Sequence, residues 1–241
     1  CFELLLFGYS YQTVSVKNLR LMVVICGLSV VILTVIVFGL WCHNSSIICL
    51  YICMGVVLGG MMNLMIPIYA VPDEPHHMYI AYEISNQLLD CDDESDSALY
   101  MRQCDYQLEL KTQSLNEEYY NKYLSYFNDN VGDTQMVQTV YAKVTGGERF
   151  LYFASALGIT IGRLLNINAI ITLSLGRMLN YIVFMLFIAC ALKMIPIAKN
   201  LIFVISFLPM TLQQAFSYSY DSYIISASVL AVAVAMNLYF E

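Results

Sequence analysis

Charged residues are scarce in this sequence, and their absence excludes several classes of protein. Asp, Glu, Lys and Arg make up 12% of the 241 residues, about half of the share in a typical soluble domain. Hydrophobic residues make up 59%, and such a chain has too little polar surface to cover a globule in water. The sequence also lacks a basic patch that would neutralise phosphates, which excludes a nucleic-acid partner. We therefore expect a membrane protein in contact with a lipid bilayer.

Acidic residues are rare outside one stretch of the chain. Of the 18 Asp and Glu residues, 15 lie between Asp73 and Glu148, which predicts one hydrophilic, acidic loop over residues 72–149. The eight cysteines lack the paired spacing of a zinc site. Two of them, Cys91 and Cys104, lie in the acidic loop and would pair only if that loop faces an oxidising compartment. The sequence leaves both the paired and the free state open.

Long apolar runs predict an all-α polytopic protein with about six transmembrane helices. Residues 21–41 and 47–69 are each long enough to cross a bilayer, which takes about 20 residues, and we expect a transmembrane hairpin over 21–71. Small residues in the "GVVLGG" of the second run favour close helix contact. Four more runs predict a four-helix transmembrane region over residues 150–241. These runs are 150–166, 169–192, 201–217 and 222–240.

The chain lacks an initiator Met and ends directly after an apolar run. We interpret it as a fragment of a longer polytopic protein, with residues 1–20 as an N-terminal segment and a truncated C-terminal region. Charge does not fix its orientation in the membrane. Lys17 and Arg20 favour an inside N-terminus and an inside acidic loop, whereas Lys193 and Lys199 would then lie outside, against the positive-inside rule.

The stretch "VPDEPHHMYIAYEIS", residues 71–85, follows the second apolar run directly. Pro75 preceded by Asp73 and Glu74 is typical of a helix start, because Pro fits the first helical position and acids cap free N–H groups. We expect a juxtamembrane amphipathic helix over 75–89, at the lip of the membrane. Helix capping explains the two acids without catalysis. The adjacent histidine pair is left unexplained by it, and suits proton transfer or binding of a divalent metal.

Two arginines fall within predicted transmembrane runs. Arg177 is placed mid-span, where a lone charge costs roughly 2.5–3.5 kcal/mol on insertion scales. It would contact a donor phosphate, pair with an acid such as Asp221, or snorkel if the span boundary is displaced; the sequence leaves these alternatives open. Arg163 lies nearer a span end, and we expect it to snorkel to the interface.

Three motifs, in this order, resemble the signatures of a family of bacterial predicted membrane proteins, domain of unknown function 2142. The second motif is the Arg-x-x-Asn of "GRMLN", with Arg177 and Asn180, and the third is "LPMTLQQAFSYSYD", residues 208–221. The first motif is the stretch "VPDEPHHMYIAYEIS", residues 71–85. Its matching residues are Pro72, Asp73, Glu74, Pro75, His77, Tyr79, Ala81, Tyr82 and Ser85.

This family is similar to the GT-C superfamily of integral-membrane glycosyltransferases, which take sugars from polyprenyl-phosphate or polyprenyl-diphosphate donors. The resemblance implies a multi-pass protein of the cytoplasmic (inner) membrane with loop 72–149 on the extracytoplasmic side. It further implies a glycosyltransferase that builds a cell-envelope polysaccharide or modifies a glycan, with a glycan or lipid as the acceptor.

Inverting sugar transfer needs a base for the acceptor hydroxyl and a positive charge for the leaving phosphate. Under this hypothesis Asp73 is the catalytic base, Glu74 assists it, and His77 hydrogen-bonds a phosphate or orients the carboxylate. Asp73 and Glu74 are also the ligands of a divalent cation, Mg or Mn, if one is used. Four residues are expected to bind substrate: Arg177, Asn180, Tyr220 and Asp221.

Two other functions stay open. A transporter or flippase for a lipid-linked glycan would line its path with Arg177 and Asp221, but such transporters usually show repeat halves and broken helices, and neither is visible in the sequence. A non-catalytic membrane scaffold subunit would tolerate single substitutions at Asp73, His77 and Arg177.

Overall fold

The structure is a computed structural model. It describes residues 27–37, 39, 46–91, 97–108, 122–123, 125–127, 130–143 and 147–240. The predicted N-terminal segment 1–20 lies outside these residues, and so do the acidic run 92–96 and both ends of the predicted span 21–41.

The chain divides into two units, which are described separately. The helical unit comprises Cys1–Met65, Tyr181–Phe216 and Asp221–Glu241. The insert unit comprises Ile66–Asn180 and Ser217–Tyr220.

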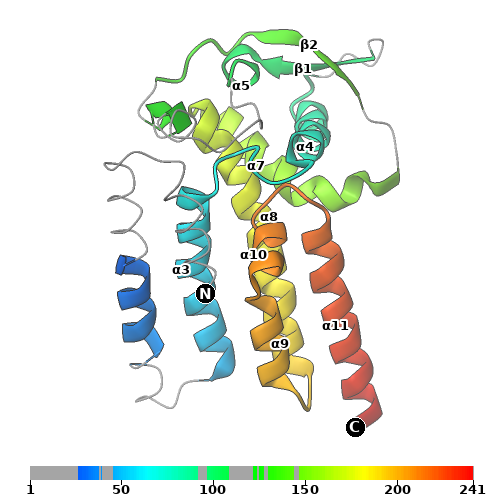
Figure 1. Cartoon of the computed structure of the whole chain (residues 1–241). Coiled ribbons are helices and arrows are strands. Elements are labelled where there is room, and N and C mark those ends of the chain that lie inside the picture. The colour runs from blue at the N-terminus through cyan, green and yellow to red at the C-terminus, as the bar shows by residue number, and fades with distance from the viewer. Residues whose placement is uncertain are drawn as a thin grey trace. The chain divides into compact units, whose positions relative to one another are not determined.

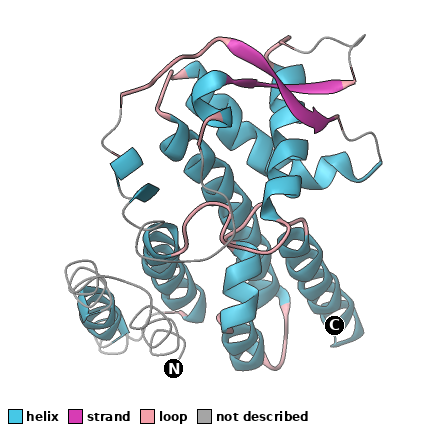
Figure 2. Ribbon diagram, turned by 45° about the horizontal axis from the view of Figure 1, so that its top comes forward, coloured by secondary structure: helices cyan, strands magenta, loops and turns pink. Residues whose placement is uncertain are grey.

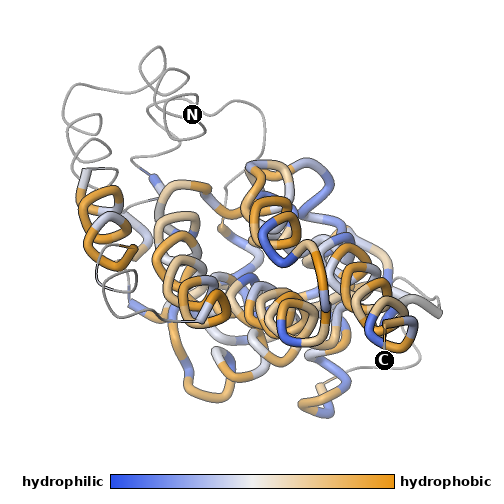
Figure 3. The backbone as a smooth tube through the Cα atoms, turned by 90° about the horizontal axis from the view of Figure 1, so that it is seen from below, coloured by the Kyte–Doolittle hydropathy of each residue, from blue (hydrophilic) through white to orange (hydrophobic). Residues whose placement is uncertain are grey.

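The helical unit is built from apolar helices. It contains a helix at Gly27–Val37, α3 (Ile47–Met65), the second part of α8 (Ala169–Met194), α9 (Lys199–Ser206), α10 (Pro209–Ala215) and α11 (Asp221–Phe240). Figure 1 shows α3, α9 and α11 side by side, and Figure 3, which looks along them, shows hydrophobic residues over most of their length. Only α8 and α11 are both long and apolar enough to cross a membrane among the described residues. The described residues therefore show two candidate spans, and the prediction of about six is not tested where residues 21–26 and 40–45 lie outside them.

The predicted span 201–217 is broken in the structure. It is divided into α9, which ends at Ser206, and α10, which begins at Pro209. Pro lacks a backbone N–H and disfavours helical geometry in the residue before it, and Leu208 is accordingly extended, with φ −62° and ψ 143°. Neither piece is long enough to cross a bilayer.

The predicted span 150–166 is also shorter than expected. A 3₁₀-helix η1 (Gly147–Tyr152) precedes α7 (Phe153–Leu164), so only 12 residues are α-helical. At 1.5 Å per residue these extend about 18 Å, well short of the roughly 30 Å hydrocarbon core. Apolar composition alone does not show where the α-helical part of this run begins.

Close helix contact occurs where the "GVVLGG" stretch predicts it. A Cβ atom built on Gly59 would lie 2.5 Å from the Tyr181 ring, and one on Gly55 would overlap the end of the Met185 side chain. The Tyr181 hydroxyl donates to the Gly55 carbonyl at 2.8 Å. Gly60, in contrast, faces open space.

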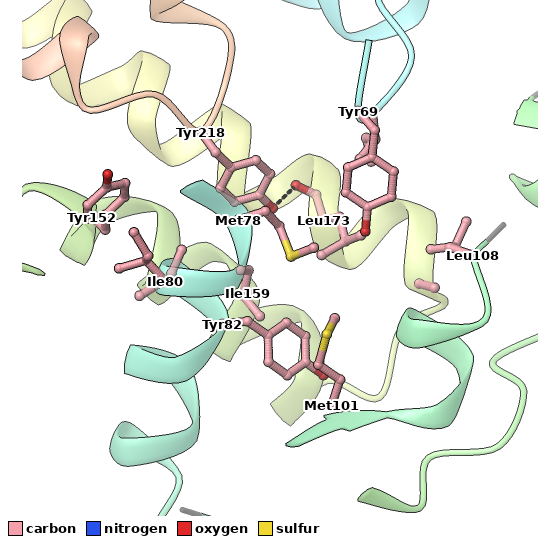
Figure 4. Close-up of a cluster of buried hydrophobic side chains, with 14 of the residues drawn as sticks. Tyr69, Met78, Ile80, Tyr82, Met101, Leu108, Tyr152, Ile159, Leu173 and Tyr218 are labelled. Atoms are coloured by element: carbon pink, nitrogen blue, oxygen red, sulfur yellow. Dashed lines mark hydrogen bonds between the residues drawn. The ribbon is translucent and has the colours of Figure 1, made fainter. Parts of the chain in front are cut away.

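The insert unit packs around a helix that follows the loop 66–73. Its elements are α4 (Glu74–Leu88), β1 (Ala98–Arg102), α5 (Gln103–Tyr106), β2 (Met136–Ala142), η1, α7, the first part of α8 and the loop 217–220. Its core is shown in Figure 4, where side chains from α4, α7, α8 and the loop 217–220 meet; they include Met78, Tyr82, Ile159, Leu173 and Tyr218.

Two strands in the insert unit differ from the all-α prediction. β1 and β2 pair antiparallel, with Arg102 opposite Met136 and an irregularity between Ala98 and Tyr100, as Figure 2 shows in magenta. The sequence of β2, "MVQTVYA", is rich in β-branched and aromatic residues, which favour a pleated strand. The acidic composition of residues 72–149 predicts a loop and does not reveal this strand.

α4 begins one residue before the predicted start of the lip helix, at 75, and ends one residue before its predicted end, at 89. It is not an amphipathic surface helix, however, because nine of its residues are buried. They include polar side chains such as Glu83, Ser85 and Asn86. α4 packs against α7, η1 and β1, so its polar groups bond to protein and α4 lies inside the insert unit.

Candidate functional site

The loop 66–73 has an unusual backbone at two positions. Tyr69 has φ 70° and Asp73 has φ 58°, both in the left-handed region. Asp visits this region more readily than most residues, whereas for a bulky residue such as Tyr it is a clear outlier. Such conformations cost of order 1–3 kcal/mol and persist only where the surroundings enforce them.

A buried ion pair holds this loop. Arg177 on α8 donates from Nε to Glu74 Oε1 at 2.6 Å and from an Nη to Glu74 Oε2 at 2.5 Å. Both side chains are 0% exposed. The same guanidinium donates to the carbonyls of Ile66, at 2.6 Å, and Pro67, at 2.9 Å. The bidentate geometry uses the planar fork that distinguishes arginine from lysine.

Glu74 extends the pair to the strained backbone. Its Oε2 also accepts the N–H of Tyr69 at 2.8 Å. One buried arginine and one buried glutamate thus fix three successive parts of the loop and the start of α4. We call these two residues the clamp. Its charges are withdrawn from solvent, so neither side chain is open to a ligand in this conformation.

The next turn of α8 holds a second loop. Asn180, three residues after Arg177, donates from Nδ2 to the carbonyls of Ser217, at 2.8 Å, and Ser219, at 3.2 Å. Tyr218 in the same loop donates its hydroxyl to the Leu173 carbonyl at 2.6 Å, a bond drawn in Figure 4. The Arg-x-x-Asn motif therefore contacts the backbones of two separate loops.

A cavity of about 620 Å³ lies beside the strained loop and the first turns of α4. Asp73 lines it, together with Pro72, His76, Tyr79 and Tyr141. The expectation that Asp73 caps α4 with its side chain is wrong, because this carboxylate makes no capping hydrogen bond. Asp73 is exposed, and its carboxylate is free to meet a ligand in the cavity.

The two adjacent histidines have different surroundings. His76 is exposed and lines the cavity with Asp73. His77 is half-buried, with its Nδ1 2.8 Å from the Tyr152 hydroxyl, and its ring lies 5.4 Å from that of Tyr220. The structure thus brings together His77 and Tyr220, two residues predicted for the site. The sequence reasoning missed His76, although its spacing of three from Asp73 places both on one helix face.

Two tyrosines form an aromatic wall of the cavity. Tyr79 on α4 and Tyr141 on β2 stack with ring centroids 4.0 Å apart, and both line the cavity. Burial raises the pKa of Tyr79, and the neighbouring phenol of Tyr141 adds to the rise, so this hydroxyl stays protonated. Tyr141 was not predicted as a site residue, because its place depends on the unforeseen strand β2.

A second buried ion pair lies deeper in the insert unit. Arg102 binds Asp105 in a bidentate manner, with N–O distances of 2.8 and 2.9 Å. Tyr82 donates its hydroxyl to the same carboxylate at 2.6 Å, and burial together with the charge of Asp105 raises the pKa of Tyr82. Arg102 also donates to Thr172 at 3.1 Å, so this network joins α4, α5 and α8.

Three other predictions can be compared with the structure. Arg163 does not snorkel: it donates to Ser85 and Asn86 of α4 at 2.9 and 2.8 Å, because those polar groups lie within its reach. Cys91 and Cys104 are both free. Asp221 begins α11 in the helical unit, whereas the acid that binds Arg177 is Glu74.

The predicted Mg or Mn site has one accessible ligand. Both Glu74 oxygens already accept hydrogen bonds from the clamp and from Tyr69, while Asp73 opens to the cavity. In the part of the chain that the structure describes, no three His, Cys, Asp or Glu side chains are grouped to hold a metal ion. The residues present therefore do not fit the predicted pair of metal ligands, because Glu74 is already bound on both oxygens.

The fold and the apolar spans are those of a mostly helical membrane protein. Residues 56–241 match the family described as predicted membrane protein (DUF2142). The match covers well over half of the chain, and the chain belongs to this family. No curated protein and no solved structure matches it.

Proposed function

We propose that this protein is an integral-membrane glycosyltransferase of the bacterial cytoplasmic membrane, and that the cavity beside Asp73 is its active site. The observation that carries the proposal is a free, exposed carboxylate held in a left-handed conformation at the edge of a 620 Å³ cavity. Strained residues gather at functional sites, and here the strain is maintained by a buried clamp from a distant part of the chain.

The donor is a polyprenyl-phosphate sugar, as the GT-C resemblance implies. In the reaction, Asp73 takes the proton of an acceptor hydroxyl while the hydroxyl oxygen attacks the anomeric carbon of the sugar. The bond between that carbon and the phosphate oxygen breaks, and polyprenyl phosphate leaves with the bonding electrons. Atoms and charge balance, because Asp73 ends protonated and the phosphate gains one negative charge.

The contacts support different roles from those first predicted for several residues. Arg177 is bound to Glu74 and to two carbonyls, so it holds the loop and does not meet the phosphate. His76 lines the cavity, and its imidazole N–H is able to donate a hydrogen bond to the leaving phosphate. Glu74 and Asn180 are positioning residues, and His77, in the first turn of α4, contacts Tyr152 and Tyr220.

The aromatic wall favours a sugar as the bound group. Tyr79 and Tyr141 present ring surface and hydroxyls, and most binding cavities combine apolar walls with a few polar groups that orient the ligand. Together with Asp73 and His76 they supply acceptors and donors suited to sugar hydroxyls. The acceptor is a glycan or lipid that reaches the cavity from the extracytoplasmic side.

The test is transfer of radiolabelled sugar from a panel of polyprenyl-phosphate sugars in membranes that contain the full chain. We expect Asp73→Asn to abolish transfer while the protein accumulates and unfolds as the wild type does. Asp90→Asn is the matched control, since Asp90 is also exposed, also has positive φ (53°) and lies in the turn that follows the same helix. Normal product from Asp73→Asn would remove the assigned role.

A second candidate is a transporter or flippase for a lipid-linked glycan. The break between α9 and α10 favours it, because discontinuous helices are common in transporters. Movement of a fluorescent polyprenyl-diphosphate glycan across sealed vesicles, without formation of a new glycosidic bond, would support this alternative over glycosyl transfer.

A further inference from the structure

α7 has most of its large apolar side chains on the outside, and apart from Ile159 its buried side chains are small or polar. The exposed positions are Phe153, Ile161 and Leu164, followed by Leu165, with exposed fractions of 47%, 43%, 68% and 65%. The buried positions are Ser155, Ala156, Gly158, Ile159, Thr160 and Gly162. A helix facing water shows the reverse arrangement, and single domains in water rarely leave such a stripe uncovered.

The buried face of α7 is small because α8 approaches it closely. A Cβ atom built on Gly158 would lie 2.4 Å from the Leu175 carbonyl oxygen, and one on Gly162 would lie 2.8 Å from the Thr172 Cα. The polar Thr160 is satisfied inside the unit by hydrogen bonds to Ser85 and to a carbonyl of α7 itself. This small-xxx-small pattern is typical of helices that pack within membranes.

The chemistry of the exposed stripe identifies what covers it. The stripe carries only aliphatic and aromatic side chains, without the Arg, Tyr or polar rim that protein interfaces usually show. The one charged residue of α7, Arg163, is turned inward onto Ser85 and Asn86. α7 is too short to cross a bilayer, yet it touches the first turns of α8, a candidate span.

We infer that the outer face of α7 inserts into the boundary between headgroups and acyl chains of the bilayer, with the helix held there by its contact with α8. Lipid, and not water or another protein, covers Phe153, Ile161, Leu164 and Leu165. α7 thus has the interfacial position that the sequence assigned to α4. The inference does not depend on the proposed enzymatic activity, since it rests on the faces of α7 alone.

Tryptophan fluorescence tests this placement in the full chain, reconstituted in phosphatidylcholine vesicles. The sequence has one tryptophan, Trp41, and Trp41→Phe gives a silent background. Ile161→Trp and Leu164→Trp then report on the stripe from two positions, so one of them is informative if the other fails to fold. Tyr106→Trp is the control, because Tyr106 is 36% exposed on α5 and lies outside the stripe.

We expect lipids brominated near the headgroup end of the acyl chains to quench the tryptophans at 161 and 164 strongly, and lipids brominated near the chain ends to quench them less. The tryptophan at 106 should respond to acrylamide in the water and not to either lipid. Quenching of the two stripe positions by acrylamide alone would overturn the inference, because the face would then be in water. Protection from both quenchers would overturn it too, since a protein would then cover α7. Stronger quenching by lipids brominated near the chain ends would also overturn the inference, because α7 would then lie deeper than the boundary.

Discussion

Removing one member of the clamp should destabilise the protein strongly. Glu74→Gln leaves the guanidinium of Arg177 buried at 0% exposure with an amide in place of a carboxylate, and the loss of one partner of a buried pair costs about 3–5 kcal/mol. Arg177→Met leaves the Glu74 carboxylate without its partner. It also leaves the carbonyls of Ile66 and Pro67 without their donors, each worth about 1–3 kcal/mol when buried and unpaired.

We therefore expect Arg177→Met to lower the free energy of unfolding more than Glu74→Gln does. The double variant should lose less than the sum of the two single losses, because it leaves no isolated buried charge whereas each single variant does. The assay is denaturant-induced unfolding in detergent, followed by tryptophan fluorescence or circular dichroism, for the wild type and the three variants. Arg177→Lys adds a second comparison, since a lysine cannot reproduce the bidentate contact.

The reasoning would be refuted if both single variants unfolded at the wild-type denaturant concentration, or if the double-mutant cycle gave additive losses. Asp90→Asn provides the control for a change of one carboxylate to an amide, in the turn after α4. It is exposed and outside the clamp, so its effect should stay within about 0.5 kcal/mol.

Three further predictions concern packing and ionisation. Gly158→Ala should lower the free energy of unfolding by about 1–3 kcal/mol, because the added Cβ overpacks against a backbone carbonyl of α8. Gly60 faces open space, so Gly60→Ala should be neutral or stabilising. Denaturant titration compares the two variants. Tyr82→Phe removes a 2.6 Å hydrogen bond to a buried carboxylate and should cost about 1.5–3 kcal/mol in the same titration. Burial raises the pKa of Cys104 to about 11, so its thiolate at pH 8 is roughly a hundredfold scarcer than for an ordinary thiol. Iodoacetamide should label Cys91 first at pH 8 and Cys104 increasingly as the pH rises, as mass spectrometry would show; equal rates at pH 8 would contradict the shift.

Local signals in the sequence predicted local structure well. Pro75 and its two preceding acids placed the start of α4 within one residue, because proline geometry and helix-end electrostatics act over a single turn. The same signals could not show that the Asp73 carboxylate leaves the helix end. That depends on the left-handed backbone of the loop, which contacts from α8 enforce.

The partners of the buried charges could not be read from the sequence. Arg177 was expected to meet a phosphate, an acid or the interface, and the acid named was Asp221. Its partner is Glu74, 103 residues away in the sequence. Periodic patterns predict contacts within one helix or strand and not between residues so far apart in the chain. The choice between His76 and His77 likewise depends on the rotation of α4, which is fixed by packing against α7 and β1.

Apolar composition predicted a membrane protein but not the lengths of its helices. Hydropathy does not register the 3₁₀ start before α7 or the extended Leu208 before Pro209, so two expected spans are shorter than a bilayer requires. The sequence of α7 does not show which of its faces is buried. That depends on α8, which packs closely against Gly158 and Gly162.

The most direct test of the proposed active site is a density map of the full chain with a non-reactive polyprenyl-phosphate sugar analogue. We predict density for the sugar beside Asp73 and the tyrosine wall, with the phosphate at His76 and the guanidinium of Arg177 still on Glu74. A ligand bound away from this cavity would contradict the account, and so would a phosphate on Arg177 with Glu74 displaced.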